Sequence, residues 1–240
     1  MTDLEYLKKY GNPEDFEKNV LQLKKGIPVQ YIVGNVSFYG INLKVTKDVL
    51  IPRFETEELV EKVLYYQSKY QLGKKCIDLG TGSGCIAITL ATRGNNVTAV
   101  DISKKALEVA KNNAEDNNVD IQFIESDFWK NVEGTYDVIV SNPPYIAEDE
   151  EIMEIVKNNE PSSALFAKDE GMACYQTILK DALKYCQERT LIAFEIGASQ
   201  REKIISLARQ YFPKEKMWVE KDLQQRDRFF FLLIERTCLN

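Results

Sequence analysis

The segment Lys75–Gly84, which reads KCIDLGTGSG, decides the fold. Its first half, Lys75–Leu79, is short and apolar, as expected of a buried strand, and its second half places glycine at every other position. Glycine lets a backbone approach a ligand closely and adopt positive φ angles. A helical pattern begins near Cys85. We therefore predict a strand, a glycine-rich turn and a helix, although tight turns of this kind also occur without a ligand.

Downstream of this segment, short β-branched runs alternate with helical patterns, which is typical of βαβ units around a mostly parallel sheet. The predicted strands are Lys75–Leu79, Val97–Ile102, Ile121–Glu125, Tyr136–Ser141, Thr190–Glu195, Lys216–Val219 and Arg228–Ile234. The predicted helices are Ile86–Thr92, Lys104–Asn117, Met172–Glu188 and Gln200–Tyr211. The connection from Glu220 to Asp227 is too short for a crossover, so the last strand must run antiparallel. The fold class is α/β, with a seven-stranded sheet.

The residues ahead of this sheet are predicted to form a small appendage. Pro13–Lys25 shows a short helical pattern, and Tyr31–Leu50, with Gly34 and Gly40 as turn residues, reads as a β-hairpin. We assign residues 1–52 to this segment and residues 53–240 to the main domain. The polar stretch Ala147–Lys168 is predicted to be a mobile loop with a short helix over the carboxyl edge of the sheet.

Composition limits the chemistry. The 240 residues include 31 Lys or Arg and 37 Asp or Glu, so the formal net charge is −6 and we expect no stable binding to nucleic acid. The chain contains no histidine, which excludes Ser-His-Asp and Cys-His hydrolases. This favours a reaction driven by a reactive cofactor that the protein positions.

Cysteine usage and hydropathy indicate a reducing compartment. The chain has no C-x-x-C pair, so we expect reduced, buried thiols instead of disulfides or a zinc site. The five cysteines are Cys76, Cys85, Cys174, Cys186 and Cys238. No apolar run is long enough for a membrane span, and the first residues lack the apolar core of a secretion signal. We expect a soluble, cytoplasmic monomer with no metal site.

Acidic and aromatic residues after the next two strands suit a nucleoside. Asp101 ends the second predicted strand, where a carboxylate accepts hydrogen bonds from ribose hydroxyls. Asp127 and Phe128 follow the third strand and offer an acceptor for an adenine amino group and an apolar wall. The structural alternatives are a helix cap for Asp101 and a surface turn for the other two. Together with the glycine turn, these residues fit NAD as well as S-adenosylmethionine.

The tetrapeptide Asn142-Pro143-Pro144-Tyr145 follows the fourth strand, at the sheet edge where open α/β sheets bind ligands. An amide-type nitrogen is a poor nucleophile because its lone pair is delocalised, so a catalyst must hold it in line and accept its hydrogens. The Asn142 side-chain oxygen and the Pro143 carbonyl could each accept one N–H, while Tyr145 offers an aromatic face. The prolines stiffen the turn. This favours methyl transfer to a planar nitrogen over a loop that merely ends a strand.

With these motifs the chain resembles the release-factor glutamine methyltransferases of the HemK/PrmC type, from Pro28 to Phe231. The shared motifs are Tyr31–Gly34, Val49–Arg53, Glu55–Glu57, Asp78–Ala87, Asn142–Ile146, Glu160-Pro161 with Ala164-Leu165, Glu195–Gly197 with Gln200, and Asp222-Leu223 with Arg226–Arg228. The resemblance implies a Rossmann-like class I fold with S-adenosylmethionine as cofactor and S-adenosylhomocysteine as product. It also implies N5-methylation of the glutamine in the Gly-Gly-Gln motif of peptide chain release factors.

The resemblance also implies roles for single residues. The cofactor would contact Gly80, Thr81, Gly82, Ser83, Gly84, Asp101, Phe128 and Asn142. The substrate glutamine would be clamped by Asn142, Pro143, Pro144 and Tyr145, with Asn142, Pro143 and Tyr145 as the catalytic residues. Arg53, Glu55 and Thr56 would line the approach, or else form a salt-bridged joint between appendage and sheet. The cluster Arg226, Asp227 and Arg228 is expected to be structural.

The chain departs from the family pattern in a few places. Phe54 replaces a proline in the I-P-R-P-E-T-E stretch, and Gln224-Gln225 stand where a small residue and a glycine are expected. The segment Phe166–Glu170 lacks the usual glycines, and fewer residues precede the hairpin than in family members. We expect these departures to affect local loop geometry and partner docking, not the clamp.

Two other functions fit the same residues. One is N-methylation of adenine or guanine in nucleic acid, because the NPPY tetrapeptide also occurs in DNA adenine methyltransferases. The net charge of −6 and the lack of a separate target-recognition domain count against it. The other is a non-catalytic nucleotide-binding module, which the altered loops suggest.

Overall fold

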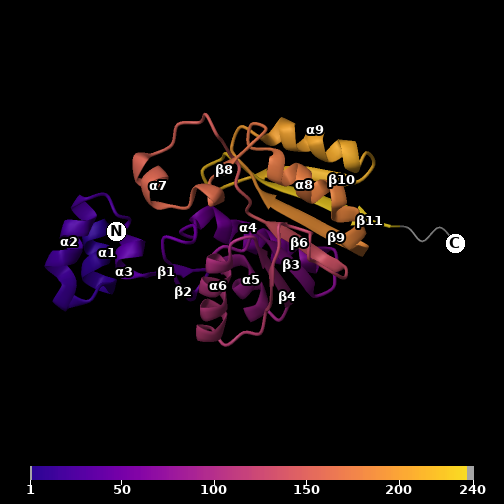
Figure 1. Ribbon diagram of the computed structural model, residues 1–240. Helices are drawn as coiled ribbons and strands as arrows, with labels where there is room; N and C mark the ends of the chain where they lie inside the picture. The colour runs from indigo at the N-terminus through magenta and orange to yellow at the C-terminus, as the bar shows by residue number, and fades with distance from the viewer. Residues whose placement is uncertain (1, 237–240) are drawn as a thin grey trace.

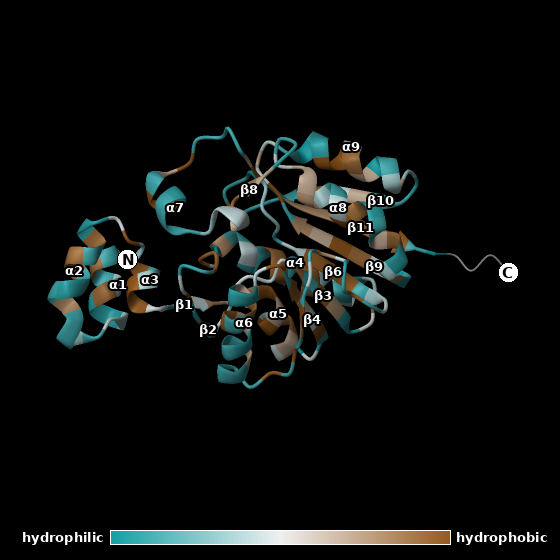
Figure 2. Ribbon diagram, viewed as in Figure 1, coloured by the Kyte–Doolittle hydropathy of each residue, from teal (hydrophilic) through white to brown (hydrophobic). Residues whose placement is uncertain are grey.

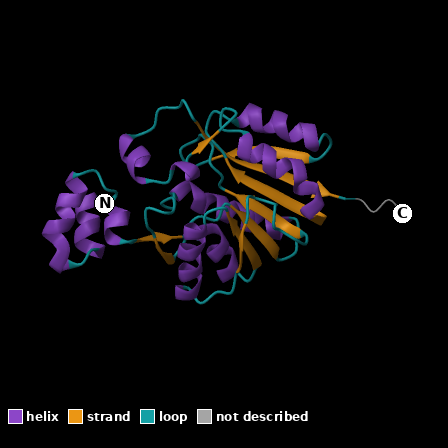
Figure 3. Ribbon diagram, viewed as in Figure 1, coloured by secondary structure: helices purple, strands orange, loops and turns teal. Residues whose placement is uncertain are grey.

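A seven-stranded sheet lies at the centre of the computed structural model, which describes residues 2–236 (Figures 1 and 3). The strand order is β10-β11-β9-β6-β3-β4-β5. The strands are β3 (Lys75–Leu79), β4 (Asn96–Asp101), β5 (Gln122–Glu125), β6 (Tyr136–Ser141), β9 (Cys186–Glu195), β10 (Lys216–Lys221) and β11 (Asp227–Glu235). Neighbouring strands are parallel except β11, which runs antiparallel to both β9 and β10. The predicted α/β fold and its reversed last strand are confirmed, with β11 inside the sheet and β10 at the edge.

Helices cover both faces of the sheet (Figure 1). On one face lie α4 (Phe54–Lys69), α5 (Cys85–Thr92) and α6 (Lys104–Asp116), and on the other α8 (Ala173–Ala182) and α9 (Arg201–Tyr211). Successive strand residues alternate between the two apolar layers, since side chains of a strand point to opposite faces. Cys76 packs in the first layer and Ile77 in the second. Figure 2 shows hydrophobic strands between helices that, except for α5, carry many hydrophilic residues.

The element bounds differ most from the prediction around residue 186. We predicted a helix as far as Glu188, but α8 ends at Ala182 and a 3₁₀ turn, Leu183–Tyr185, follows it. The strand β9 begins at Cys186, which pairs with Tyr136 of β6. Pairing with the neighbouring strand therefore overrides the helical spacing of the apolar residues in this segment.

Helix α4 was absent from the predicted elements. Its outer surface is polar, but Leu59, Val60 and Val63 are completely buried at helical spacing. Glu55 and Glu57 lie in its first turn, where negative charges interact favourably with the helix dipole and so stabilise the helix. The helix begins directly after Arg53, and its first turn reaches the carboxyl end of β9, where Thr56 bonds to Glu195.

The N-terminal appendage contains more helix than predicted. In place of a single helix over Pro13–Lys25, the structure has α1 (Asp3–Tyr10), a 3₁₀ turn (Pro13–Asp15), α2 (Phe16–Lys24) and α3 (Val29–Val33). The hairpin is present but shorter, as β1 (Asn35–Phe38) and β2 (Ile41–Lys44). It cannot include Tyr31, because Tyr31 lies within α3, which is capped by Gly34 with a φ of +83°.

The Asn113 side chain of α6 holds the appendage against the main domain. Its oxygen accepts from the backbone N–H of Lys44 at 2.7 Å, and its amide nitrogen donates to the Lys44 carbonyl at 3.0 Å. The same nitrogen donates to the Ser83 carbonyl at 2.9 Å. One buried amide thus ties the hairpin to the glycine turn.

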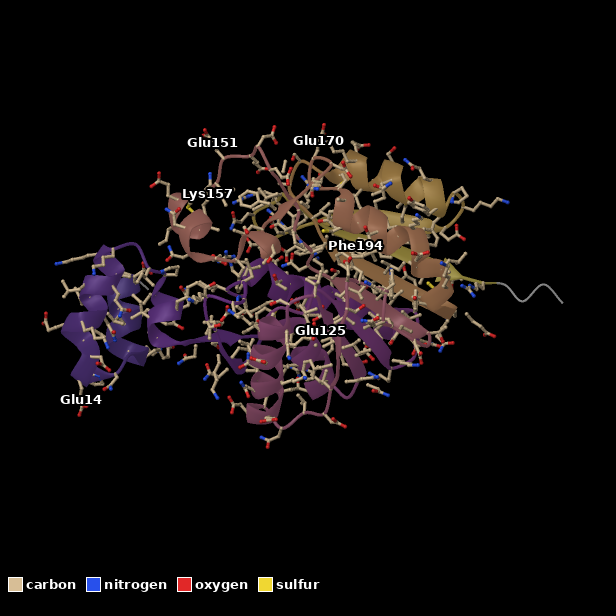
Figure 4. The ribbon with its side chains drawn as sticks, in the orientation of Figure 1. Glu14, Glu125, Glu151, Lys157, Glu170 and Phe194 are labelled. Carbon is tan, nitrogen blue, oxygen red and sulfur yellow. The ribbon has the colours of Figure 1, made fainter. Side chains whose placement is uncertain are left out.

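The segment predicted as a loop with a short helix contains α7 (Glu154–Asn159) between two short paired strands, β7 (Ile146–Ala147) and β8 (Phe166–Ala167). A 3₁₀ turn, Ser162–Ala164, precedes β8. Glu151 and Lys157 lie exposed on the outer side of this segment (Figure 4). The predicted short helix is confirmed.

Three of the predicted buried thiols, Cys76, Cys85 and Cys186, are buried and free. Cys174 is free but only partly buried, contrary to the prediction, because it faces a cavity described below. Cys238 lies outside the described residues. Along residues 2–236, no helix combines the length and apolar character that crossing a membrane requires.

Candidate active site

The glycine-rich turn leaves open space at the carboxyl end of β3. Gly80 and Gly82 have φ angles of +78° and +55°, and a Cβ atom on either would meet nothing within 4 Å. Gly84 differs, because a Cβ atom there would lie 2.9 Å from Ile88 and 3.2 Å from Ala110. The first two glycines therefore keep the turn open, while Gly84 allows close packing of α5 against α6.

The Asp101 carboxylate holds this turn against β4. One of its oxygens accepts from the Gly82 N–H at 2.9 Å, and the other accepts from the Ser103 N–H at 2.8 Å. Each oxygen retains acceptor capacity after these bonds. Burial raises the pKa of Asp101, which the backbone donors oppose. Asp101 thus organises the turn, and Ser103 caps α6 instead, by accepting from the Ala106 N–H at 3.2 Å.

A cavity of about 400 Å³ opens beside the turn, at the carboxyl ends of β3, β4, β5 and β6. The predicted site residues that line it are Gly80, Thr81, Gly82, Ser83, Asp101, Asp127, Phe128, Asn142, Pro144 and Thr56. Residues that the sequence did not single out complete it, among them Leu50, Ile102, Ser126, Phe166 and Cys174. Gly84, Pro143 and Tyr145 do not line this cavity.

A smaller pocket of about 200 Å³ adjoins this cavity. Asn142 lines both, so the side chain stands on the wall that they share. The smaller pocket is lined by Arg53, Tyr145 and Glu195 as polar residues, and otherwise by apolar residues: Leu50, Ile146, Ile152, Met153, Val156, Ala164 and Leu165. The polar side chains of this pocket thus gather beside Asn142 in mostly apolar surroundings.

A chain of hydrogen bonds leads from Asn142 to a buried carboxylate. The Asn142 amide nitrogen donates to the Thr56 hydroxyl at 3.1 Å, and that hydroxyl donates to a Glu195 oxygen at 2.7 Å. The other Glu195 oxygen accepts from the Tyr145 hydroxyl at 3.4 Å. Glu195 is 2% exposed, and this burial raises the pKa of its carboxyl to about 7.

The backbone after the tetrapeptide is fixed by Gln200. Its amide nitrogen donates to the Tyr145 carbonyl at 2.7 Å, and its oxygen accepts from the Gly197 N–H at 2.8 Å. The Ser141 hydroxyl, just before the tetrapeptide, donates to the Leu79 carbonyl of β3 at 2.5 Å. One end of the Asn142–Tyr145 loop is thereby held on β3 and the other on Gln200, the residue that precedes α9, as accurate positioning of reacting groups requires.

A second buried acid lies beneath the glycine turn. One oxygen of Asp78 accepts from the Thr81 hydroxyl at 2.6 Å, and the other has no hydrogen-bond partner among residues 2–236. Burial raises the pKa of Asp78 to about 7. The sequence analysis assigned no role to either Asp78 or Glu195. A charged residue within an apolar strand is the signal that could have identified both.

The two arginine-containing motifs differ in role. Arg53 forms a 2.5 Å ion pair with Glu160, and the Ile51 N–H donates to the same carboxylate at 3.1 Å. Arg53 thus lines the smaller pocket, and its salt bridge joins it to the segment between α7 and β8 and not, as the alternative expectation had it, the appendage to the sheet. Arg228 was expected to be structural, yet it donates to the Tyr145 hydroxyl at 3.4 Å, as well as to the Ile196 carbonyl.

Comparison with known proteins identifies related chains. A family model described as methyltransferase small domain matches residues 57–186. The release factor glutamine methyltransferase of Lactococcus lactis is 43% identical over 211 residues, which cover 86% of this chain and 77% of that protein. The protein of the same name from Bacillus subtilis is 39% identical over 232 residues, covering 92% of this chain and 81% of the relative.

Solved structures show the same fold. A 16S rRNA N2 G1207 methyltransferase from T. thermophilus, solved with AdoMet and guanosine, has a TM-score of 0.63 at 16% identity, covering 84% of this chain and 50% of its own. A methyltransferase from Pyrococcus furiosus has a TM-score of 0.59 at 17% identity, covering 91% of this chain and 98% of its own. At such low identity the similarity concerns the fold alone.

Proposed function

The chain belongs to the family of release factor glutamine methyltransferases, and from this membership we propose that it methylates the side-chain amide nitrogen, N5, of the glutamine in the Gly-Gly-Gln motif of peptide chain release factors. The methyl donor is S-adenosylmethionine, and the protein is a protein-(glutamine-N5) methyltransferase. The observation that carries the proposal is the position of Asn142 between two adjoining pockets. A donor in one pocket and an acceptor in the other would meet at this side chain.

The larger cavity suits S-adenosylmethionine in size and chemistry. Its volume of about 400 Å³ is within the range of pockets for small organic ligands. The free acceptor capacity of Asp101 suits the ribose hydroxyls, and the open backbone at Gly80 and Gly82 leaves room for the amino-acid part. Phe128 provides an apolar wall for the adenine, with Asp127 as an acceptor for its amino group.

The tetrapeptide supplies the acceptors that a weak nucleophile needs. Bound S-adenosylmethionine supplies an electrophilic methyl group on a sulfonium sulfur. In our proposal the Asn142 oxygen accepts one N–H of the substrate amide and the Pro143 carbonyl accepts the other. Both acceptors favour the positive charge that develops on nitrogen during attack. Tyr145 packs its ring against the planar amide, and Pro144 stiffens the loop.

No side chain is required to remove the proton. Glu195, the buried acid that lines the smaller pocket, accepts from Thr56 and Tyr145, and we assign it to positioning these two groups and not to proton removal. The methylated nitrogen carries an acidic proton once the bond has formed, and this proton can leave to water. The chain therefore contributes positioning and electrostatics.

We further propose how the substrate reaches the pocket. Residues 1–52 would form a docking unit for the release factor, and residues 53–240 the methyltransferase domain. The Asn159 side chain at the end of α7 donates to the Gly26 carbonyl at 2.9 Å, so α7, whose Val156 lines the smaller pocket, contacts this unit. The protein is proposed to act as a cytoplasmic monomer, without stable binding to nucleic acid.

A labelling experiment tests this function. Purified protein is incubated with radiolabelled S-adenosylmethionine and a release factor, alongside a release factor whose motif glutamine is replaced by asparagine. Label is expected in the first protein and not in the second. Equal labelling of both, or label in an extract that nuclease treatment removes, would contradict the proposal and support nucleic acid as the acceptor.

A further inference from the structure

A single carboxylate reaches both ends of the Asn142–Tyr145 loop. Glu195 ends β9, which lies beside β6, so its side chain meets the loop that follows β6. One oxygen accepts from the Thr56 hydroxyl at 2.7 Å and the other from the Tyr145 hydroxyl at 3.4 Å. Phe194, the preceding residue, faces the core (Figure 4). Of these two neighbouring residues, Phe194 packs in the core and Glu195 belongs to the site.

The direction of these hydrogen bonds follows from the chemistry of the groups. An ionised carboxylate only accepts, so the Thr56 hydroxyl must donate its single proton to Glu195. That hydroxyl can then only accept from its second neighbour. Asn142 must therefore present its amide nitrogen to Thr56, as the 3.1 Å contact shows. The Asn142 oxygen is left to point elsewhere, and no hydrogen bond to it occurs within residues 2–236.

On this basis we propose that Glu195 and Thr56 are positioning residues, which fix the orientation of the Asn142 amide so that its oxygen, and not its nitrogen, meets the substrate. This inference rests on the proposed function, in which Asn142 must accept an N–H. The opposite orientation would place an N–H against the substrate N–H, and the clamp would repel the group that it binds.

Tyr145 is oriented by the same rule. Arg228 donates to the Tyr145 hydroxyl at 3.4 Å, so this hydroxyl directs its own proton to Glu195. The Arg228 side chain lies 3.5 Å from the Asp222 carboxylate, which takes up its charge. Glu195 thus sets the direction of the hydrogen bonds of Asn142, through Thr56, and of Tyr145 directly. The positive charge of Arg228 is balanced by Asp222.

Stability alone does not explain a carboxylate at this position. Glu195 is 2% exposed and forms no direct ion pair among the described residues, because Arg228 pairs with Asp222 instead. Burying a charge without such a partner is costly, and a neutral residue of similar shape is often at least as stable. A charge retained at a cost to the fold is consistent with a role in the site.

The test compares variants that change the hydrogen-bond direction with variants that do not. Thr56→Val keeps the shape but removes the hydroxyl, whereas Thr56→Ser keeps the hydroxyl. Glu195→Gln can turn its NH₂ toward Thr56, which would reverse the chain of hydrogen bonds. Tyr175→Phe is the matched control, because the Tyr175 hydroxyl donates at 2.7 Å to the backbone carbonyl of Glu195 and lies outside the site.

We expect kcat on a release factor to fall about tenfold or more in Thr56→Val and Glu195→Gln, with KM for S-adenosylmethionine within about threefold of wild type. Thr56→Ser should keep at least about five times the kcat of Thr56→Val. Tyr175→Phe should lower the thermal midpoint but keep kcat within about twofold. The proposal is overturned if Thr56→Val and Glu195→Gln keep wild-type kcat, or if kcat in all variants follows the thermal midpoint alone.

A second measurement needs no methyl acceptor. The ¹⁵N–¹H₂ signal of the Asn142 side chain can be assigned by its loss in Asn142→Asp. We expect this signal to shift in Thr56→Val but not in Tyr175→Phe, because only the first removes its acceptor. An unchanged signal in Thr56→Val contradicts the inference. Failure of the wild-type protein to methylate release factor would contradict the proposed function, and this signal would still decide the orientation of Asn142.

Discussion

Replacing Glu195 with glutamine should remove a pH dependence of methyl transfer that the wild-type protein shows near neutrality. Burial raises the pKa of Glu195 to about 7. Only the ionised carboxylate forces Thr56 to donate toward it, so protonation loosens the orientation of Asn142. A group with this pKa is about one-tenth ionised at pH 6 and about nine-tenths ionised at pH 8. We therefore expect kcat to be about ninefold lower at pH 6 than at pH 8.

The tyrosines and the arginine around Glu195 do not titrate in this range, and Asp78 beneath the glycine turn, whose pKa burial also raises to about 7, is common to both proteins. Glu195 faces Glu55 and Thr56 from α4, Tyr145, Tyr175 from α8 and Arg228 from β11. Burial raises the pKa of both tyrosines above the usual value, and the arginine keeps its charge. The difference between wild type and Glu195→Gln therefore isolates the carboxyl group of this residue.

The same shift fixes the sign of a stability effect. A glutamate in the unfolded chain has a pKa near 4.5, so between about pH 4.5 and 7 the folded protein retains a proton that the unfolded chain has lost. The free energy of unfolding contributed by Glu195 therefore falls as pH rises. This rise in the pKa of Glu195 corresponds to roughly 3 kcal/mol as an order of magnitude. At pH 8, well above this range, Glu195→Gln should be at least as stable as wild type.

The assay is methyl transfer to a release factor under single-turnover conditions across this pH range, with thermal unfolding of both proteins in the same buffers. We expect a rate that rises with pH in wild type and a lower, flat rate in Glu195→Gln. Parallel pH profiles in the two proteins would refute the reasoning, as would a Glu195→Gln variant that is less stable than wild type at pH 8.

The remaining predictions concern the cavity and its joint with α4. Asp101→Ala should weaken S-adenosylmethionine binding about tenfold or more, since the ribose acceptor and the anchor of Gly82 are lost together; an affinity within twofold in calorimetry would contradict this. Gly84→Ala should lower the thermal midpoint more than Gly82→Ala, because only at Gly84 would a Cβ atom collide with neighbours. Gly82→Ala should reduce the affinity for the cofactor more than Gly84→Ala. The reverse order of the two variants in both measurements would argue against the cavity as described. Arg53→Met should destabilise the fold by about 3 kcal/mol, because the carboxylate of Glu160, 1% exposed, loses its partner; adding Glu160→Gln should restore most of this in urea unfolding, and no recovery would count against the ion pair.

Local patterns in the sequence predicted the features that depend on neighbouring residues. The glycine turn, the strand before it and the tetrapeptide after β6 are continuous segments, and a strand followed by a tight turn dictates where their side chains lie. Because the carboxyl ends of parallel strands share one edge, the sequence also predicted that Gly82, Asp101 and Asn142 would line one cavity, as they do.

The parts that were not predicted depend on contacts between distant residues. Thr56 and Glu195 are 139 residues apart, and Thr56 and Asn142 are 86 residues apart, so no spacing in the chain indicates that they share hydrogen bonds. Asn113 likewise joins Lys44 and Ser83 only in the folded protein. Such long-range polar contacts decide the orientation of the site, and only the packed structure displays them.

The central claim is that Asn142 presents a glutamine side-chain amide to the methyl donor. Mass spectrometry of a release factor, after incubation with S-adenosylmethionine and either the wild-type protein or Asn142→Ala, tests it most directly. We expect a mass gain of one methyl group on the glutamine of the Gly-Gly-Gln motif with wild type, and a yield lower by about two orders of magnitude with Asn142→Ala. A methyl group on any other residue, no methyl group with wild type, or equal yields from the two proteins would contradict it.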